Sequence, residues 1–442
     1  MRATRNRRRG QRSLGILVVP VLVLLAATAA LRAEAPKTDW VWATAYALPK
    51  ETTSDESGYF SIIEGLAQPG KAGPLFIGTA KYGSNAYLVE FNPDSKQMRV
   101  VVEAQKEIGT TASGFAAQSK FHTRNNLGAS GKIYIGTKQG YAKDGEKWED
   151  YPGGYPMVYD PKSGKTRVYP IAIPHHGIIS IAPDESRGVA YISTCSDQRP
   201  ESSHFMILDL ETGKYQDLIE SRHMFAFIVI DHRGRAYHPL LGGDVARWDP
   251  ESKKLERLKQ TVDGAPPSAD SHLADPDSHP INWDISPDRK TLYALAMNGN
   301  QLYAYDLTAE GDTFKGRSLG KLVAAAKAVD CRAMCAGPEG DVWASVSATL
   351  PTNETQVRLV SYHPGDKAPV DRGALAIRNP DYTPFTDAAG KALPFHHGVK
   401  KTEDGTLVPL YTLGICQSHD GTVTVTNLCP FSILQAKFPN QR

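Results

Sequence analysis

Hydrophobic and polar positions along this chain recur in a unit of about 50 residues. The unit is complete between Ser278 and Leu307. It predicts one strand over 281–286, a turn at 287–289, a second strand over 292–297 and a third strand ending at 305–306. Turn-flanked strands that end in an aromatic residue recur at Tyr134, Tyr191, Tyr237, Tyr293 and Trp343, in steps of 57, 46, 56 and 50 residues. Short strands at this period are typical of the blades of a β-propeller.

Seven such copies predict an all-β, seven-bladed β-propeller that occupies residues 36–442 as one domain. The copies cover 59–96, 118–165, 175–214, 223–254, 278–307, 330–367 and 411–437. An eighth copy would have to lie in 376–410, where Pro, Asp and Gly are too frequent for strands. The strand-like segment Trp40–Pro49 has no blade of its own, so we expect it to pair with the C-terminal strands and close the ring.

Residues 1–35 combine an arginine-rich start with an apolar run over 14–31, which predicts an export signal peptide. The alternative is an uncleaved anchor, because about 18 apolar residues just span a bilayer. After cleavage we expect a secreted or periplasmic protein with no stable membrane insertion.

Removal of this segment changes the sign of the net charge. Seven of the 50 Lys and Arg and one of the 48 Asp and Glu lie in residues 1–35, which leaves 43 basic against 47 acidic residues. The chain has no basic stripe that would follow a phosphate backbone, so nucleic acid is not an expected partner.

Five cysteines in a chain of this size do not indicate a disulfide scaffold. Cys331 and Cys335 are too far apart along one predicted strand to be bridged. Cys335 and Cys416 occupy matching places on neighbouring inner strands, which leaves a disulfide open, but buried thiols are the favoured interpretation.

Histidines are placed in register with the repeat. His223 and His279 each stand fourteen residues before the aromatic residue of their blade, His176 stands fifteen before it and His122 twelve, and His397 precedes the last blade. Each histidine alone is best explained as a strand cap. As a set they predict a site at one mouth of the axial channel, where imidazoles hold a divalent metal or bind an anion and move protons. Asp330 and Asp284 are further candidate metal ligands.

Long segments between strands, at 137–155 and 196–204, are expected to crowd the same mouth. Aromatic and cationic residues gather in these segments and in the fourth blade: Lys138, Tyr141, Trp148, Tyr151, Tyr155, Arg199, His204, Tyr237, His238 and Arg247. Aromatic faces suit sugar rings and cations suit carboxylates, although ordinary loop composition explains any single one of these residues equally well.

These residue types best support β-elimination in a uronic-acid polymer. That reaction needs cations or a metal to neutralise the carboxylate, a base for the neighbouring proton, and an acid at the leaving oxygen. No carboxylate pair suggests a glycosidase, and there is no nucleophile elbow, Walker loop, dinucleotide fingerprint or haem attachment motif.

The runs QSKFHTRNNLGASGKIYIGTKQGY (118–141) and YPGGYPMVYDPKSGK (151–165) resemble secreted seven-bladed propeller polysaccharide lyases of the ulvan-lyase type. The resemblance covers about 120 residues and is fold-level analogy elsewhere. It implies that His122 is a substrate-contacting histidine. The second histidine of that family falls at Lys138, which keeps a cation but loses an imidazole. Tyr237 and Arg247 match the remaining roles by position in the fourth blade. The related oligogalacturonate lyases use a histidine-bound metal, which His223, His279 and His397 would supply.

We therefore expect a monomeric propeller that binds an acidic polysaccharide or oligosaccharide and cleaves it by β-elimination. His122 and Tyr237 would handle protons, and Lys138 and Arg247 would neutralise the carboxylate. The expected substrate-binding residues are Tyr155, Arg199, His238 and His176. His223, His279 and His397 would hold the metal if Mn, Ca or Zn is present. The alternatives are a non-catalytic propeller that binds glycan or protein, and a metal-dependent lactonase or hydrolase.

Overall fold

A computed structural model of the chain describes residues 39–53, 61–196, 203–221, 227–267, 281–393 and 396–438. Residues 38–442 form one compact unit. No helix within the described ranges is long and apolar enough to cross a membrane. The predicted export signal, at residues 1–35, lies outside these ranges.

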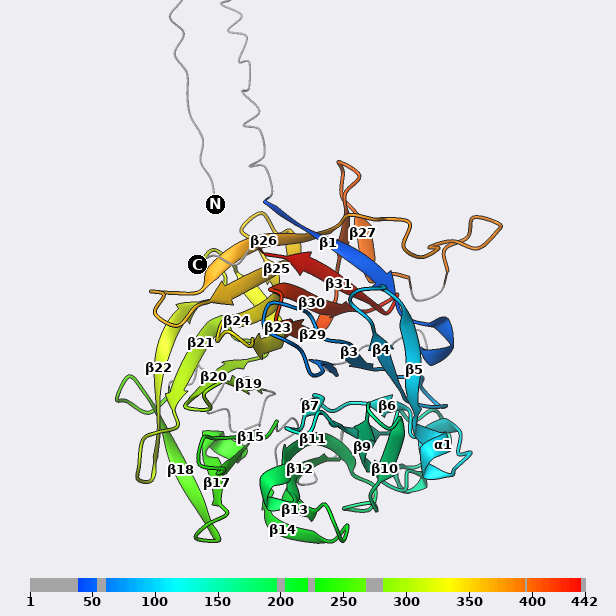
Figure 1. The fold of residues 1–442 in the computed structure, drawn as a ribbon. Coiled ribbons are helices and arrows are strands. Elements are labelled where there is room, and N and C mark those ends of the chain that lie inside the picture. Colours follow the sequence, from blue (N-terminus) through cyan, green and yellow to red (C-terminus); the bar gives the residue numbers. More distant parts are fainter. Residues whose placement is uncertain are drawn as a thin grey trace, which may run out of the picture. The chain divides into compact units, whose positions relative to one another are not determined.

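The described strands form five sheets, and Figure 1 shows them arranged around a centre. The first sheet contains β2 (Ile62–Glu64), β3 (Leu75–Gly78), β4 (Tyr87–Phe91) and β5 (Met98–Glu103). The second contains β6 (Lys120–Phe121), β7 (Asn126–Leu127), β8 (Ile133–Lys138), β9 (Pro156–Asp160) and β10 (Lys165–Val168). The third contains β11 (Gly177–Asp184), β12 (Val189–Cys195), β13 (Ser203–Asp209) and β14 (Tyr215–Ser221).

Two larger sheets complete the fold. The fourth sheet contains β15 (Val229–Ile230), β16 (Ala236–Pro239), β17 (Val245–Asp249), β18 (Lys254–Val262), β19 (Ile281–Ile285), β20 (Thr291–Ala296), β21 (Gln301–Asp306) and β22 (Thr313–Lys321). The fifth contains β1 (Trp40–Ala47), β23 (Ala328–Ala336), β24 (Val342–Thr349), β25 (Thr355–Tyr362), β26 (Val370–Ile377), β27 (Val399–Lys401), β28 (Leu407–Pro409), β29 (Thr412–Gln417), β30 (Thr422–Asn427) and β31 (Ser432–Lys437). The helices are short: α1 (Ala104–Ile108), η1 (Lys50–Thr52), η2 (Gly114–Ala116), η3 (Trp148–Asp150), η4 (Glu185–Arg187) and η5 (Leu241–Gly243).

Each large sheet is joined by parallel pairing of outer strands, β18 with β22 and β1 with β26. When the two sheets are divided at these parallel pairs, the described strands of the five sheets form seven runs of four or more strands. The innermost strands β2, β7, β11, β15, β19, β23 and β29 contact one another in order, and β29 contacts β2. The fold is therefore all-β and has the arrangement of a propeller.

The N-terminal strand closes this circuit, as predicted. Residues 40–43 of β1 pair in parallel with β26, and residues 44–47 pair antiparallel with β31. Ala43 and Ala45 are buried in the core between these strands, while Trp42 is exposed, so the strand alternates inward and outward residues. Closure leaves no unpaired edge where the chain ends meet.

The region 376–410, which was expected to lack strands, contains the short strands β27 and β28. They pair with each other, and Leu407 pairs with Ile377 at the end of β26. The prediction was wrong because Pro and Gly interrupt long strands but are compatible with a hairpin of two three-residue strands at the end of a sheet.

The hydrophobic core is divided among the seams between neighbouring blades. One cluster joins the first and second sheets through Phe76, Phe121 and Ile135, and the next joins the second and third through Tyr134, Ile178 and Ile192. Successive residues of a strand point to opposite faces, so Tyr134 and Ile135 pack against different neighbours. Alternate residues of one strand therefore pack against the preceding blade and the following blade.

Candidate functional site

Two buried lysines and a buried histidine lie together on the inner part of the second sheet. β6 and β8 pair antiparallel with Lys120 opposite Lys138, and His122 follows directly after β6. Lys120, His122 and Lys138 are 1%, 3% and 0% exposed, although two of them are lysines, which are rarely buried. We call these three residues the cation cluster.

The alternation of side chains explains why the cluster forms. Lys120, His122 and Arg124 stand at every second position of the segment, while Phe121 between them packs into the core against the first sheet. The sequence analysis singled out only His122. The period-two pattern of cations in KFHTR was the signal that could have found Lys120 and Arg124 as well.

The ammonium group of Lys120 lies over two tyrosine rings. Its Nζ is 5.5 Å from the ring centre of Tyr82 and 4.9 Å from that of Tyr141, and the two rings are 5.2 Å apart. This is the arrangement of a cation–π contact. Tyr141 is half exposed, so it connects the buried lysine with the surface.

Lys138 extends from β8 toward the third sheet. Its Nζ is 3.5 Å from the Sγ of Cys195, which lies at the end of β12. The preceding residue, Thr137, faces the other way and donates a hydrogen bond of 2.6 Å to the side-chain oxygen of Gln118. Lys138 thus lies in the same sheet as His122, as a buried strand residue and not a loop residue.

His122 is held in its neutral form. Burial, and then the positive charges of Lys138 and Lys120, keep the pKa of the His122 imidazole well below its usual range. A neutral imidazole can accept a proton at neutral pH, so the residue has the protonation state that a general base requires.

Two further histidines lie on the neighbouring third sheet. The rings of His176 and His204 meet edge to face at 5.5 Å, and His176 Nδ1 is 3.2 Å from the Thr194 hydroxyl. His204 Nδ1 is 2.7 Å from a carboxylate oxygen of Asp217. His176, a predicted substrate-binding residue, lies directly before Gly177, the first residue of β11, where an added Cβ would lie 2.3 Å from Cγ of Lys138. Tyr155, another such residue, packs instead against the core between the first and second sheets.

Tyr237 and His238 are adjacent in sequence and point to opposite blades. The Tyr237 hydroxyl donates to Asp231 at 2.9 Å, and its ring packs on Phe314. His238 stacks on Phe205 of the third sheet, and its Nε2 is 2.9 Å from the Ser193 hydroxyl. Burial and the charge of Asp231 raise the pKa of Tyr237, which keeps its hydroxyl protonated. These contacts connect Tyr237 with the core of the fourth sheet and give no support to its predicted catalytic role.

Arg247, the other residue assigned from the fourth blade, is also held inside that sheet. Its guanidinium donates to Glu256 at 2.8 Å and to the carbonyl oxygen of Gly311 at 3.0 Å. The described contacts do not bring Arg247 to the cation cluster, so its predicted role in carboxylate binding has no support from them.

The predicted metal ligands are only partly described. His223, His279 and the substrate-binding candidate Arg199 lie outside the described residues. His397 is exposed, with its ring 6.3 Å from that of Tyr411. Within the described ranges no three His, Cys, Asp or Glu side chains are grouped closely enough to hold a metal ion. The described surroundings of His397 therefore do not fit a metal centre.

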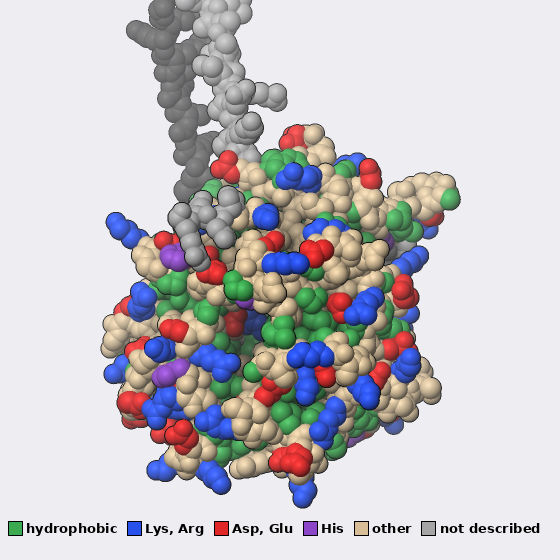
Figure 2. Space-filling model, in the orientation of Figure 1, with side chains coloured by type: hydrophobic (Ala, Val, Ile, Leu, Met, Phe, Trp, Pro, Cys, Tyr) green, Lys and Arg blue, Asp and Glu red, His purple; other side chains and the backbone are tan. Residues whose placement is uncertain are grey.

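Arg124 links the inner strands of three sheets. It donates to the carbonyl oxygen of Trp283 at 2.6 Å, to the carboxylate of Asp284 at 2.8 Å and to the carbonyl oxygen of Met334 at 2.7 Å. Asp284, a candidate metal ligand in the sequence analysis, also accepts the backbone N–H of Ala336. Figure 2 shows a hollow near the middle of one face, with acidic and basic side chains visible inside it.

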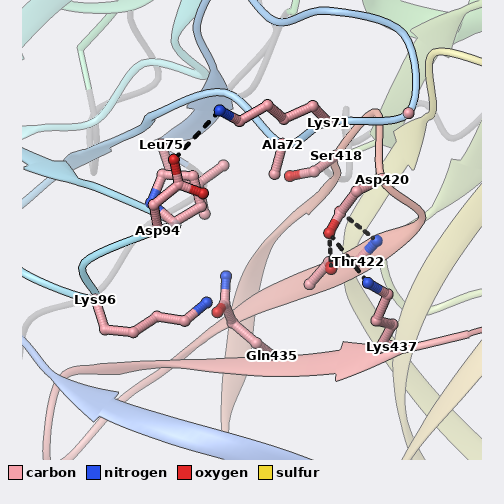
Figure 3. Close-up of a pocket in the computed structure, with 12 residues that line it drawn as sticks. Lys71, Ala72, Leu75, Asp94, Lys96, Ser418, Asp420, Thr422, Gln435 and Lys437 are labelled. Atoms are coloured by element: carbon pink, nitrogen blue, oxygen red, sulfur yellow. Dashed lines mark hydrogen bonds and ion pairs between the residues drawn. The ribbon is translucent and has the colours of Figure 1, made fainter.

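A separate cavity of about 170 Å³ lies between the first sheet and the β29–β31 part of the fifth (Figure 3). Two of its three lysines pair with aspartates: Lys71 lies 3.4 Å from Asp94, and Lys437 lies 3.6 Å from Asp420. None of the residues predicted from sequence lines this cavity. Two ion pairs therefore line this polar cavity.

Comparison with known proteins informs the fold only. No protein-family model matches the chain, and no curated protein matches it in sequence. The β-propeller domain of Myceliophteria thermophila Cps50 (Swd1) superposes with a TM-score of 0.51 at 10% identity, covering 87% of this chain and 97% of that one. The periplasmic gluconolactonase of Pseudomonas aeruginosa gives 0.49 at 13% identity, covering 83% of this chain and 92% of that one.

The extracellular domain of a protein named as a hybrid two-component system from B. thetaiotaomicron gives a TM-score of 0.48 at 11% identity. The match covers 90% of this chain but only 40% of that one. At such identities structural likeness shows the fold and not the activity. The strand pairing, the closed circuit of inner strands and the likeness to the Cps50 domain together show that residues 38–442 form a β-propeller.

Proposed function

We propose that the cation cluster binds the carboxylate of an acidic saccharide and that His122 removes the neighbouring proton in a β-elimination. The observation that supports this proposal is a neutral imidazole beside two buried ammonium groups. Buried cations attract an anion strongly because little water screens them. A base that stays unprotonated next to a carboxylate site is what proton abstraction beside a carboxylate requires.

The proposed reaction uses residues of the second sheet and its loop. Lys138 and Lys120 neutralise the carboxylate, which makes the hydrogen on the adjacent ring carbon more acidic. His122 takes that proton, the electron pair forms a carbon–carbon double bond, and the bond to the leaving oxygen breaks. Tyr141, half exposed beside Lys120, donates the proton that the leaving oxygen needs.

The burial of the cluster limits what can bind. Lys120, His122 and Lys138 have almost no contact with solvent, so the side chains around them must move before a saccharide carboxylate reaches them. A carboxylate at the end of an oligosaccharide needs less movement than one in the middle of a polymer. We therefore expect short acidic oligosaccharides to be better ligands than long chains.

The test is incubation of purified protein with a panel of uronic-acid polymers and their oligosaccharides, with ultraviolet absorbance of the unsaturated product as the readout. His122→Gln should abolish product formation, and Lys138→Met should both raise KM and lower kcat, because Lys138 binds the carboxylate and also acidifies the neighbouring hydrogen. Lys71→Met, which removes an exposed lysine far along the chain, is the matched control and should keep wild-type activity. Product formation by His122→Gln at the wild-type rate would refute the proposal.

The same burial favours a second candidate, a propeller that binds acidic saccharide without cleaving it. Calorimetric binding of an oligosaccharide that Lys138→Met weakens, with no unsaturated product from wild-type protein on any substrate, would support binding alone. Neither binding nor product, from protein shown to be folded by its cooperative thermal transition, would exclude both candidates.

A further inference from the structure

The contact between Lys138 and Cys195 joins two sheets through side chains that water hardly reaches. Nζ of Lys138 lies 3.5 Å from Sγ of Cys195, and the two residues are 0% and 1% exposed. Lys138 ends β8 of the second sheet, and Cys195 ends β12 of the third. An amine and a thiol are thus held within contact distance at a position from which solvent is excluded.

The geometry depends on Gly177, the first residue of β11. Gly177 is paired with Cys195 across the sheet, so it stands between Lys138 and the thiol. A Cβ at this glycine would lie 2.3 Å from Cγ of Lys138 and 2.9 Å from its Cβ and Cδ. The missing side chain therefore leaves the passage through which the lysine reaches the sulfur.

This lysine contact distinguishes Cys195 among the cysteines. All five cysteines lie in the described part of the chain and are buried thiols, as the sequence analysis favoured. Cys331 and Cys416 direct their sulfur toward the carbonyl oxygens of Ala333 and Gln417, each at 3.8 Å. Burial raises the pKa of both of these thiols, which keeps them protonated and unreactive.

We propose that Lys138 and Cys195 form an oxidative cross-link in which one oxygen atom bridges the lysine nitrogen and the cysteine sulfur. Dioxygen is the oxidant. The amine N–H and the thiol S–H are lost, N–O and O–S bonds form with one oxygen atom, and the second oxygen leaves as water with the two hydrogens removed. The lysine and cysteine together give up the four electrons that reduce dioxygen. An exported protein, which the N-terminal segment predicts, works in a compartment where such oxidation is not reversed by cytosolic thiols.

The cross-link would change the site as well as the fold. It ties the second sheet to the third by a covalent bond, and it removes the positive charge of Lys138 beside His122. If the proposed function holds, oxidation should therefore switch saccharide binding off, and reduction should restore it. The cross-link itself does not depend on that function.

The experiment is mass spectrometry of intact protein purified under reductant and then exposed to air. Cross-linked protein should be about 14 Da heavier, because one oxygen is gained and two hydrogens are lost. Peptide mapping should join the peptides of Lys138 and Cys195, and dithiothreitol should reverse the change. Cys195→Ser and Lys138→Arg should both lose the product, and Cys331→Ser is the matched control that should keep it.

Gly177→Ala tests the geometry without removing either partner. The added methyl group should displace Lys138 and reduce the cross-linked fraction at least several-fold, in protein whose thermal unfolding remains cooperative. If that variant does not fold, the Lys138→Arg result decides. A gain of about 16 Da without a joined peptide, or an unchanged cross-link in Lys138→Arg, would overturn the proposal. A cross-link in oxidised protein, together with no unsaturated product from the same protein after reduction, would leave this inference standing and count against the lyase.

Discussion

Replacement of Arg124 by Met tests whether the link across the inner strands stabilises the ring. Arg124 is 16% exposed and its partner Asp284 23% exposed, so water screens the pair only partly. Removal of one partner of a buried ion pair costs about 3–5 kcal/mol. Asp284 keeps the N–H groups of Ile285 and Ala336 as donors, which lowers the cost of leaving its charge behind. We therefore expect the free energy of unfolding to fall by about 2–3 kcal/mol.

The measurement is chemical denaturation followed by circular dichroism, with the midpoint and the slope fitted separately. A lower midpoint at unchanged slope reports lost stability of the native state. Arg99→Met is the matched control, because Arg99 lies 2.8 Å from Glu90 but is 67% exposed on the first sheet. Such a surface pair contributes at most about 1 kcal/mol.

A second comparison separates the ion pair from the two carbonyl contacts. Arg124→Met combined with Asp284→Asn should be more stable than Arg124→Met alone, because no unpaired carboxylate is left behind. Equal losses from Arg124→Met and Arg99→Met would refute the reasoning that the inner-strand link stabilises the ring.

Three other predictions concern the cluster, the fourth sheet and ring closure. The pKa of His122 is lower in the folded state than in the unfolded chain, where it is about 6.5. The free energy of unfolding should therefore fall as the pH drops below about 6.5, by up to about 1.4 kcal/mol per pH unit. Denaturation midpoints of His122→Gln should depend less on pH between about 6.5 and 5 than those of wild type. Tyr237→Phe should lower the free energy of unfolding by about 1–2 kcal/mol, because it removes the hydrogen bond to Asp231, and it should leave saccharide binding unchanged. Loss of binding in folded Tyr237→Phe would show that Tyr237 belongs to the binding site after all. Ala43→Asp should lower the free energy of unfolding by more than about 3 kcal/mol, because it buries a charge where β1 closes the ring. Trp42→Asp, on the exposed side of the same strand, should cost much less. Similar thermal midpoints for the two variants would contradict this reasoning.

Much of the fold could be predicted from local patterns. Strand alternation and turn residues repeat along the chain, so the propeller class and the closing role of Trp40–Ala47 could be derived without knowledge of any distant contact. The same alternation in residues 120–124 contains the signal for a cationic face, although only His122 was taken from it.

The site could be predicted less well. The position of a residue within the repeat shows where it lies along a strand, but it does not show which neighbouring blade its side chain faces. His122 and Lys138 lie near each other because β6 and β8 belong to one sheet, but their predicted roles stay predictions. Tyr237 and His238 were assigned to one mouth, but successive strand residues point to opposite neighbours.

By itself, the sequence determined most of the strands, their repeat and the N-terminal segment that closes the ring, because these depend on propensities and periods within a few residues. Only the tertiary structure decided which groups meet across sheets: Arg124 with Asp284, 160 positions apart, and Lys138 with Cys195 over the gap at Gly177. Such contacts depend on how far each sheet is rotated against the next and on the space that one missing side chain leaves. Neither quantity is encoded in a local pattern.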